Sequence, residues 1–441
     1  MTSVKKTFCI YHQLHQPYRV NFVKEHDKAD YSDFFVGPNP GKRGKDYANE
    51  TIFNQVAENS YIPATEYWLN LIHDFRELNI TLSLSGTFLE QALSYRRFGE
   101  KVISNLKKLV DTGRVELLGE TYYHSLSFLY DIQEYLEQIQ KHRNVIQELF
   151  DYEPISFRNT ELIYHKHLAE IIRQLGYRTI VASKVYDKMD DRGLSGGIAS
   201  KFQLTADETE LIARYRIAKP QDNISVLLNE TTVSRGLFIM SDVEEAKDVI
   251  LNSEMKLINF FTDFEIYGEH NKDKNNGLLQ VMRDIIKSSI DSGMLLNTVT
   301  EAGKRFREGE YSSDEYTTWA NSFHDLRTWV GQDNQNKAHR KMMVLLTLIK
   351  NLEPSKTQEY DSILEMWRKL STSDHFYYMP VYDTEHENWS LDLFSPYESA
   401  QQAYDIFIEA CDYLTRRIIQ ANLSASKLTL PIAHHSHNIY H

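Results

Sequence analysis

The chain has few cysteines and no long apolar run. Its 441 residues include two cysteines, Cys9 and Cys411, at opposite ends of the sequence. Two are too few for a disulfide framework or a cysteine-based zinc site. The longest apolar stretch, 342–349, is much shorter than the roughly 18 residues that a membrane-spanning helix needs. The amino-terminal residues also lack the apolar core of a signal peptide, so we expect a cytoplasmic protein with no membrane partner.

Positive charge is scarce relative to negative charge. The chain has 49 Lys and Arg against 62 Asp and Glu, a formal net charge of −13. Proteins that bind nucleic acids or anionic membranes need an excess of Lys and Arg to displace counterions. The charge balance therefore argues against a nucleic-acid partner and favours neutral or cationic ligands. Aromatic residues make up 12% of the chain, and such rings either fill cores or stack on sugars.

Short runs of β-branched and aromatic residues alternate with segments of helical periodicity. The expected strands are 6–12, 80–85, 114–120, 155–161, 179–183, 225–229, 256–265 and 295–298. The expected helices between them are 64–78, 102–112, 132–150, 165–175, 242–251 and 278–292. Gly113, Gly176 and Gly293 follow three of these helices, where a left-handed C-cap favours glycine. The segment 184–236 has no clear pattern.

This alternation predicts an α/β fold with a mostly parallel sheet, and seven or eight such units can close into a barrel. Beyond about residue 300 the strand signals stop, and helical patterns appear at 335–352, 360–369 and 397–422. We therefore expect a catalytic barrel at 1–300. A C-terminal helical domain at 301–441 should follow it and contribute to the active-site rim.

Several expected strands end in polar side chains. His15 follows the first strand, Glu120 and Glu161 end two others, and Asp263 and Glu265 lie at the end of a fourth. In a parallel barrel these ends meet at one rim, where the reactive groups of such enzymes gather. Carboxyl groups that converge with histidines suit glycosidic bond hydrolysis, in which one attacks or orients water and another protonates the leaving oxygen.

Five segments carry a resemblance to a known family. They are His15-Gln16-Pro17, the stretch 86–90, Glu161 within FRNTELIY, the stretch 263–268 (DFEIYG), and the stretch 324–331 (HDLRTWVG). In these segments the chain resembles glycoside hydrolase family 57, the α-amylase and 4-α-glucanotransferase family, and most closely its α-amylase members. The resemblance implies a distorted seven-stranded barrel followed by helices, and an α-glucan or maltooligosaccharide substrate.

The resemblance also implies roles for individual residues. Glu161 is expected to be the nucleophile and Asp263 the acid/base of a retaining double displacement. The expected substrate-binding residues are His15, Glu120, Glu265, His270, Asp325 and Trp329, with Trp329 stacked on a glucose ring. An equally supported interpretation makes Glu120 the ion-pair partner of a nearby arginine. Many relatives have a histidine where this chain has Gln13, which leaves open whether His12 makes that sugar contact.

Two alternative functions stay open at this level. A 4-α-glucanotransferase or branching enzyme would use the same residues, because the outcome depends on whether water or a sugar reaches the glycosyl-enzyme first. Alternatively, His12 and His15 with Asp263 would form a metal site in a barrel like those of zinc-dependent mannosidases and deacetylases. The sequence has no HExxH helix and no third ligand at a fixed spacing. We therefore expect neither a metal nor another cofactor.

Overall fold

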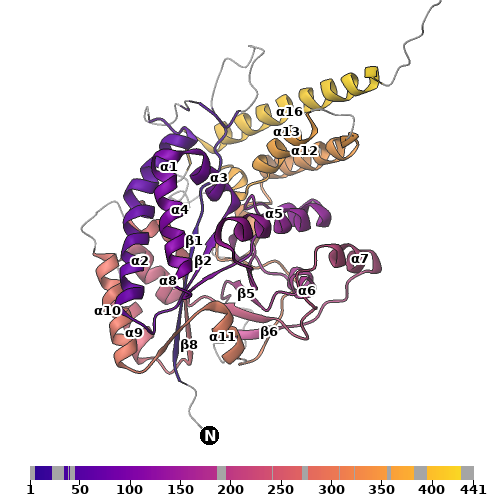
Figure 1. Ribbon diagram of the computed structural model, residues 1–441. Coiled ribbons are helices and arrows are strands. Elements are labelled where there is room, and N and C mark those ends of the chain that lie inside the picture. The colour runs from indigo at the N-terminus through magenta and orange to yellow at the C-terminus, as the bar shows by residue number, and fades with distance from the viewer. Residues whose placement is uncertain are drawn as a thin grey trace, which may run out of the picture.

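The computed structural model describes residues 5–21, 34–37, 39, 45–185, 195–240, 242–270, 277–306, 308–321, 323–354, 359–381 and 395–428. Figure 1 shows central strands surrounded by helices, with the long C-terminal helices lying together on one side. Within these ranges, no helix combines the length and the apolar character that crossing a membrane requires.

Strand β1 (Thr7–Leu14) is the centre of the first sheet. It pairs in parallel with β8 (Leu257–Asp263) from Thr7 to Gln13. On its other edge the carboxyl half pairs with β2 (Ile80–Leu84), which in turn pairs with β3 (Val115–Leu117). The amino half of that same edge pairs with β9 (Leu295–Asn297), so β9 lies beside β1 only at the amino end.

The second sheet continues the parallel arrangement. Its strands β4 (Ser156–Arg158), β5 (Thr179–Ala182) and β7 (Ser225–Leu228) pair in parallel in that order. Strand β6 (Gly196–Ala199) runs antiparallel to β7, and β10 (Glu310–Tyr311) pairs with β6. The sequence did not predict β6 or β10, because both are short and β6 begins with two glycines.

The two sheets join on both sides and form a distorted barrel. A parallel bridge between Gly119 and Phe157 connects β3 with β4. A hydrogen bond of 2.7 Å from the backbone N–H of Glu230 to the carbonyl of Asn259 connects the end of β7 with β8. The ring is therefore β1, β2, β3, β4, β5, β7 and β8, which are seven strands. All eight expected strands are present, and the eighth, β9, is outside the ring.

Helices cover the barrel on its outside (Figure 1). They are α1 (Asn49–Val56), the π-helical turn η2 (Ala57–Tyr61), α2 (Ile62–Asp74), α3 (Gly86–Ser94), α4 (Arg96–Asp111), α5 (Ile132–Phe150), α6 (Lys166–Leu175), α7 (Ala206–Arg214), α8 (Thr231–Ile239), α9 (Val243–Asn252), α10 (Leu278–Asp291) and α11 (Val299–Arg305). The six expected helices are among them. Gly113, Gly176 and Gly293 have φ of 71°, 103° and 76°, the left-handed conformation expected of C-cap glycines.

The C-terminal helices are α12 (Asp333–Lys350), α13 (Tyr360–Leu370), α14 (Ser373–Tyr377) and α16 (Ala400–Leu428). Their apolar side chains belong to the same hydrophobic core as the β4 side of the barrel. Trp367 and Phe376, for example, are fully buried in one cluster with Phe157 and Ile171. This shared core holds the helices against the carboxyl ends of the strands, and α14 reaches the barrel mouth.

Candidate active site

Glu161 lies in a tight turn immediately after β4. It belongs to the 3-10 turn η4 (Thr160–Leu162) and has φ 57° and ψ 27°. A left-handed conformation is unusual for a residue with a side chain and is a form of strain found at functional sites. The hydroxyl of Thr318 donates a hydrogen bond of 2.7 Å to the Glu161 carbonyl and helps to hold this backbone conformation. The turn presents the carboxylate at the barrel mouth rather than to the core.

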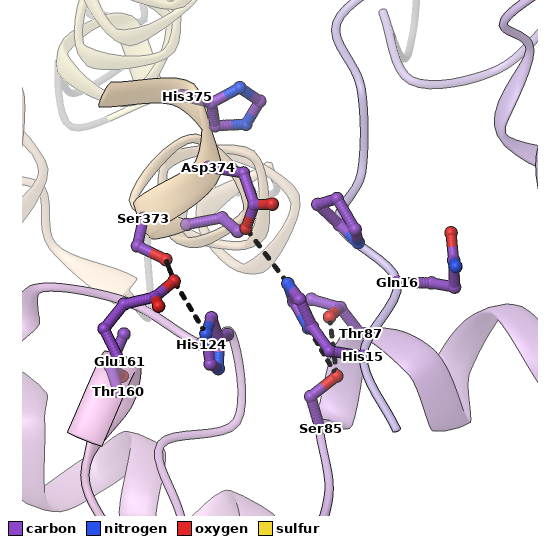
Figure 2. Close-up of polar contacts among 12 residues, drawn as sticks. His15, Gln16, Ser85, Thr87, His124, Thr160, Glu161, Ser373, Asp374 and His375 are labelled. Carbon is purple, nitrogen blue, oxygen red and sulfur yellow. Dashed lines mark hydrogen bonds and ion pairs between the residues drawn. The ribbon is translucent and has the colours of Figure 1, made fainter. Parts of the chain in front are cut away.

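Three side chains surround the Glu161 carboxylate. Nε2 of His124 lies 3.2 Å from Oε1, and the Ser373 hydroxyl donates a hydrogen bond of 3.1 Å to the same oxygen (Figure 2). The indole Nε1 of Trp319 donates a hydrogen bond of 2.9 Å to Oε2. These donors come from three separate segments, one after β3, one after β10 and one at the start of α14. The carboxylate is therefore held by both the barrel and the C-terminal helices.

The surrounding charges keep Glu161 ionised. Burial raises its pKa, but the hydrogen bond and positive charge of His124 and the charge of Arg158 outweigh burial and lower the pKa below its ordinary value. The pKa of His124 moves the other way: burial lowers it, and the hydrogen bonds to Glu120 and Glu161 raise it to about 9. The guanidinium of Arg158 is itself buried beside these carboxylates.

Asp263 ends β8 opposite Gln13 of β1. Its side chain is 53% exposed, but protein surrounds it on several sides, and Nε2 of His270 lies 4.0 Å from Oδ2. The pKa of Asp263 is raised to about 6, first by loss of water around the carboxyl group and then by the negative charge of Glu161, against the lowering effect of Arg158. Asp263 and Glu161 therefore influence each other electrostatically and have pKa values shifted in opposite directions.

His15 lies between the barrel and α14. Its Nε2 lies 3.0 Å from Oδ2 of Asp374, and its Nδ1 lies 2.8 Å from the Ser85 hydroxyl (Figure 2). The His15 ring also packs against the ring of His124, with centroids 4.1 Å apart and the planes tilted by 30°. Because both ring nitrogens already have partners in the protein, the expected hydrogen bond from His15 to a sugar hydroxyl would have to replace one of these contacts.

Glu120 is connected to Glu161 through His124, whose two ring nitrogens contact the two carboxylates. The Glu120 side chain is fully buried, with Oε2 3.3 Å from Nε2 of Gln13 and 3.4 Å from Nδ1 of His124. Burial raises its pKa, but His124, His142 and Arg158 outweigh burial and lower it. Of the two interpretations from the sequence, the geometry favours a charge partner over a substrate contact.

The question about Gln13 and His12 is answered by burial. Gln13 is 3% exposed and contacts Glu120 and His124, whereas His12 is 0% exposed. The His12 ring packs against Trp68, Phe260, Phe264 and Tyr267, and burial lowers its pKa to about 3. His12 therefore does not replace the histidine that many relatives have at position 13.

Glu265 is buried behind Asp263. Its Oε1 accepts hydrogen bonds of 2.5 Å from the Tyr61 hydroxyl and 3.1 Å from the backbone N–H of His15. Burial and then the charge of Asp263 raise the pKa of Glu265 to about 8. The raised pKa favours the neutral form of the carboxyl group, and at 5% exposure the residue supports the loop after β1. Direct contact with a sugar would require movement of this loop.

Trp329 corrects one prediction from the sequence. Its side chain is 0% exposed and packs inside the core that joins the barrel to the C-terminal helices, so it cannot stack on a bound glucose. The sequence motif correctly identified a structured segment but not the direction of the ring. Trp319, which the sequence analysis did not select, is 48% exposed and contacts Glu161.

Asp325 lies in the same segment but has a local role. Its carboxylate forms an ion pair of 2.8 Å with Arg327 and accepts the backbone N–H of that residue at 3.0 Å, which caps the short turn η7 (Leu326–Thr328). Within the part of the chain that the structure describes, no hydrogen bond or ion pair joins Asp325 to Glu161 or Asp263. Its predicted contact with substrate stays a prediction.

No metal cluster emerges among the residues with described positions, where no group of three His, Cys, Asp or Glu side chains has a suitable arrangement. Asp374, Ser373 and Trp319 complete the site, and the sequence analysis selected none of them. Ser373 is separated from Glu161 by 212 positions, and no local pattern can reveal such a contact.

A barrel whose mouth carries a glutamate with a lowered pKa and an aspartate with a raised pKa is typical of glycoside hydrolases. The model of Glycosyl hydrolase family 57 matches residues 9–313, which is more than half of the sequence and includes both residues. The chain belongs to this family and is a glycoside hydrolase. Trp319 and Ser373 lie beyond the matched range.

Individual relatives agree with this membership. A Methanocaldococcus jannaschii protein named "Putative alpha-amylase" is 28% identical over 386 residues, which cover 84% of this chain and 76% of that protein. A branching enzyme of the same family from Thermococcus kodakaraensis has a TM-score of 0.63 at 11% identity, over 96% of this chain and 93% of that one. The 4-alpha-glucanotransferase from Thermococcus litoralis has a TM-score of 0.60 at 15% identity, over 93% of this chain and 60% of that one. At these identities, the structural likeness shows the fold alone.

Proposed function

We propose that this protein is a retaining hydrolase of α-1,4-glucans, similar in activity to an α-amylase, with Glu161 as nucleophile and Asp263 as acid/base. The similarity to the Methanocaldococcus jannaschii protein supports the substrate class. The net charge of −13 suits a neutral sugar polymer better than a nucleic acid or an anionic membrane. Two buried free cysteines suit a reducing compartment such as the cytoplasm.

The observation that carries the proposal is that two carboxyl groups at strand ends of one barrel mouth have pKa values shifted in opposite directions. Glu161 is kept ionised by His124 and Arg158, as attack on an anomeric carbon requires. Asp263 has a pKa of about 6 and is mostly protonated below that pH, as donation to a leaving oxygen requires. Different environments that separate the pKa values of two carboxyl groups in this way are typical of glycosidase acid and nucleophile pairs.

The reaction then follows a double displacement. A Glu161 oxygen attacks the anomeric carbon of the α-glucoside while Asp263 gives its proton to the departing oxygen, which leaves a β-glucosyl ester on Glu161. Asp263, now ionised, accepts a proton from an incoming water that attacks the same carbon and releases Glu161. Two inversions give a product of retained α configuration. We expect the two carboxyl groups to lie about 5 to 5.5 Å apart, as in other retaining pairs.

Trp319 is the aromatic residue best placed to hold a sugar near Glu161. Its ring is 48% exposed while its indole nitrogen is anchored on Oε2 of Glu161. A half-exposed ring offers a face on which a glucose can stack, and its anchor fixes the distance of that face from the nucleophile. We assign to Trp319 the stacking role that the sequence suggested for Trp329.

Azide rescue tests the two catalytic assignments separately. Glu161→Ala should be inactive on maltooligosaccharides, and azide should restore cleavage of an α-maltooligoside with a good leaving group by forming a β-glycosyl azide. Asp263→Ala should form the α-glycosyl azide instead, because azide then attacks the β-glycosyl ester on an intact Glu161. Nuclear magnetic resonance of the products distinguishes the two anomers. If both variants form the same anomer, the assignment of the pair is wrong.

The product profile from maltoheptaose tests hydrolysis against transfer. Hydrolysis gives only shorter maltooligosaccharides, because water accepts the glycosyl group. The transfer alternative gives chains longer than seven glucose units, and branching gives α-1,6 linkages that an isoamylase removes. Longer or branched products would replace the hydrolase proposal with a transferase that uses the same two carboxyl groups.

A further inference from the structure

The hydrogen bonds to Glu161 are distributed unequally between its two carboxylate oxygens. Oε1 accepts from both His124 and Ser373, at 3.2 and 3.1 Å. Oε2 accepts from Trp319 alone among the residues whose side chains are described, at 2.9 Å. Each oxygen of an ionised carboxylate has about two acceptor sites. Oε1 is therefore saturated, and Oε2 keeps a lone pair.

We propose that His124 and Ser373 are positioning residues that fix Oε1 of Glu161, so that Oε2 is the attacking atom. This inference rests on the proposed function and adds the identity of the reacting oxygen and of the groups that select it. In the glycosyl-enzyme, Oε2 is bonded to the anomeric carbon, and Oε1 becomes the carbonyl oxygen of the ester. His124 and Ser373 then continue to donate to Oε1.

The electron balance shows where these donors act. In the first step the Oε2–C1 bond forms, the bond from C1 to the leaving oxygen breaks, and the proton of Asp263 moves to that oxygen. In the second step the oxygen of water bonds to C1, its proton moves to Asp263, and the electron pair of the C1–Oε2 bond returns to Glu161. Negative charge reappears on the carboxylate in this second step. Donors to Oε1 stabilise the charge and so accelerate departure of Glu161.

Each ring nitrogen of His124 faces its own carboxylate, Nδ1 towards Glu120 and Nε2 towards Glu161. His124 is 2% exposed, and its backbone has φ 50°. The Nδ1 atom of its ring contacts Glu120 and Gln13, on the side of the ring away from Glu161. Because the ionised Glu161 carboxylate accepts only, the hydrogen on Nε2 must point to Oε1. The charged groups that face the pair are Glu120 after β3, Arg158 of β4, Asp263 of β8 and Asp374 of α14, and the His15 ring packs against His124.

Ser373 is fixed to His124 through the backbone. The N–H of Ser373 donates a hydrogen bond of 3.0 Å to the carbonyl of His124, and Ser125 forms an antiparallel bridge with Thr372. The two donors to Oε1 are therefore connected to each other independently of Glu161. A carboxylate entering this arrangement finds both donors already placed, which is the condition for effective electrostatic stabilisation.

Two substitutions of His124 make a matched pair. His124→Gln places an amide near the position of Nε2 and keeps a donor to Glu161. His124→Asn places its amide near the position of Nδ1, keeps the contact with Glu120 and removes the donor to Glu161. Asparagine also tolerates the left-handed backbone of this position. Ser373→Ala removes the second donor. The control is Ser371→Ala, because the Ser371 hydroxyl donates to the Arg368 carbonyl and not to Glu161.

The readouts are the steady-state rate on an activated aryl α-maltooligoside, the fraction of glycosyl-enzyme by mass spectrometry, and the pH profile of kcat/KM. With this substrate the second step limits kcat, so His124→Asn should lower kcat by a factor of about 10 to 100, the value of one hydrogen bond to a charged group. KM should fall with kcat, and the glycosyl-enzyme should accumulate. Ser373→Ala should lower kcat about tenfold, whereas His124→Gln should keep most of the wild-type kcat.

The acid limb of the pH profile provides a readout that a structural role would not change. Donors to Glu161 hold its pKa down, so removal of one raises that pKa and moves the acid limb to higher pH. His124→Asn and Ser373→Ala should both show this shift, Ser373→Ala with little change in melting temperature, and Ser371→Ala should show none. If His124→Asn does not fold, Ser373→Ala gives the same test without a change in the barrel.

The results also separate failure of this inference from failure of the proposed function. If Glu161→Gln is inactive but Ser373→Ala keeps kcat within twofold, with the acid limb unmoved and no glycosyl-enzyme accumulated, the positioning role is overturned and the function stands. If His124→Gln loses as much rate as His124→Asn, the Nε2 donor is not the cause, and the inference fails. If Glu161→Gln keeps near full activity, both the proposed function and this inference are overturned.

Discussion

The indole Nε1 of Trp319 donates a hydrogen bond of 2.9 Å to Oε2 of Glu161. This contact connects the segment between β10 and α12 with the turn after β4. The Trp319 ring is 48% exposed, whereas Trp329 in the same segment is fully buried. The two tryptophans therefore serve different purposes, one at the active site and the other in the core.

Replacing each tryptophan with a smaller residue should affect activity at position 319 and stability at position 329. Trp319→Leu should lower kcat/KM for maltooligosaccharides by at least tenfold with little change in melting temperature, because it removes a site contact and not core packing. Trp329→Ala should reduce the free energy of unfolding by about 3 to 5 kcal/mol, as large-to-small changes of buried aromatics do. Denaturant titration and kinetics of both variants check this. Equal loss of stability in both would contradict the assignment.

The pH profile of kcat/KM should be bell-shaped and narrow. Asp263 acts in its protonated form, so activity should fall as pH rises through its pKa of about 6. Glu161 acts in its ionised form, and its pKa lies below the ordinary value of 4.5, so activity should fall only at more acidic pH. The maximum should lie between these limits. With an activated aryl substrate that needs no acid, the alkaline limb of the glycosylation rate should flatten, and its persistence would argue against Asp263 as the acid.

Asp374→Asn should destabilise the protein in a pH-dependent way. Burial raises the pKa of Asp374, but the charge and hydrogen bond of His15 outweigh it and hold the pKa well below the ordinary value. A depressed carboxyl pKa gives stability that is complete above the unfolded value near 3.9 and disappears as pH falls through the folded value. The variant should be about 1 to 3 kcal/mol less stable at pH 7, and the difference should shrink below about pH 4. Urea titration at both pH values measures it, and a difference that stays constant would exclude the ionised Asp374 carboxylate and its contact with His15 as the source.

Glu265→Gln should become relatively more stable as pH rises. The pKa of Glu265 is raised from 4.5 to about 8 in the folded protein. Between these two pH values the folded wild type therefore holds a proton on Glu265 that the unfolded chain has released. The folded state therefore loses stability between about pH 4.5 and pH 8. Glutamine is neutral in both states and can still accept from Tyr61 and His15. Unfolding at pH 5 and pH 8 tests this, with Glu66→Gln on the surface as the control.

Activity should survive EDTA. His12 is buried among aromatic rings, and His15 is bound to Ser85 and Asp374, so neither histidine is available to a metal as placed. Initial rates on maltooligosaccharides after chelation and dialysis check the expectation. Loss of activity followed by recovery with zinc would favour a metal-dependent mechanism instead.

Local patterns in the sequence determined the barrel, most of its helices and two central site residues. Strands such as β1 and β8 are rich in apolar and aromatic residues, and α5 ends at Phe150 as its periodicity predicted. The positions of Glu161 and Asp263 follow from the same logic, because side chains at the carboxyl ends of parallel strands share one rim. Strand β6 was missed because it begins with two glycines, and β10 was missed because it has only two residues.

Only the tertiary structure decided how the site is completed. The direction of a side chain at a loop or helix end depends on the packing of distant elements, which no spacing in the sequence encodes. Trp329 lies in the core cluster that side chains of α12 and α13 share with the barrel, whereas Trp319 contacts Glu161. Ser373 reaches Glu161 because a shared core and a backbone hydrogen bond to His124 hold α14 at the barrel mouth. The sequence by itself placed Glu161 and Asp263 at the ends of their strands, and long-range packing selected the donors that hold Glu161.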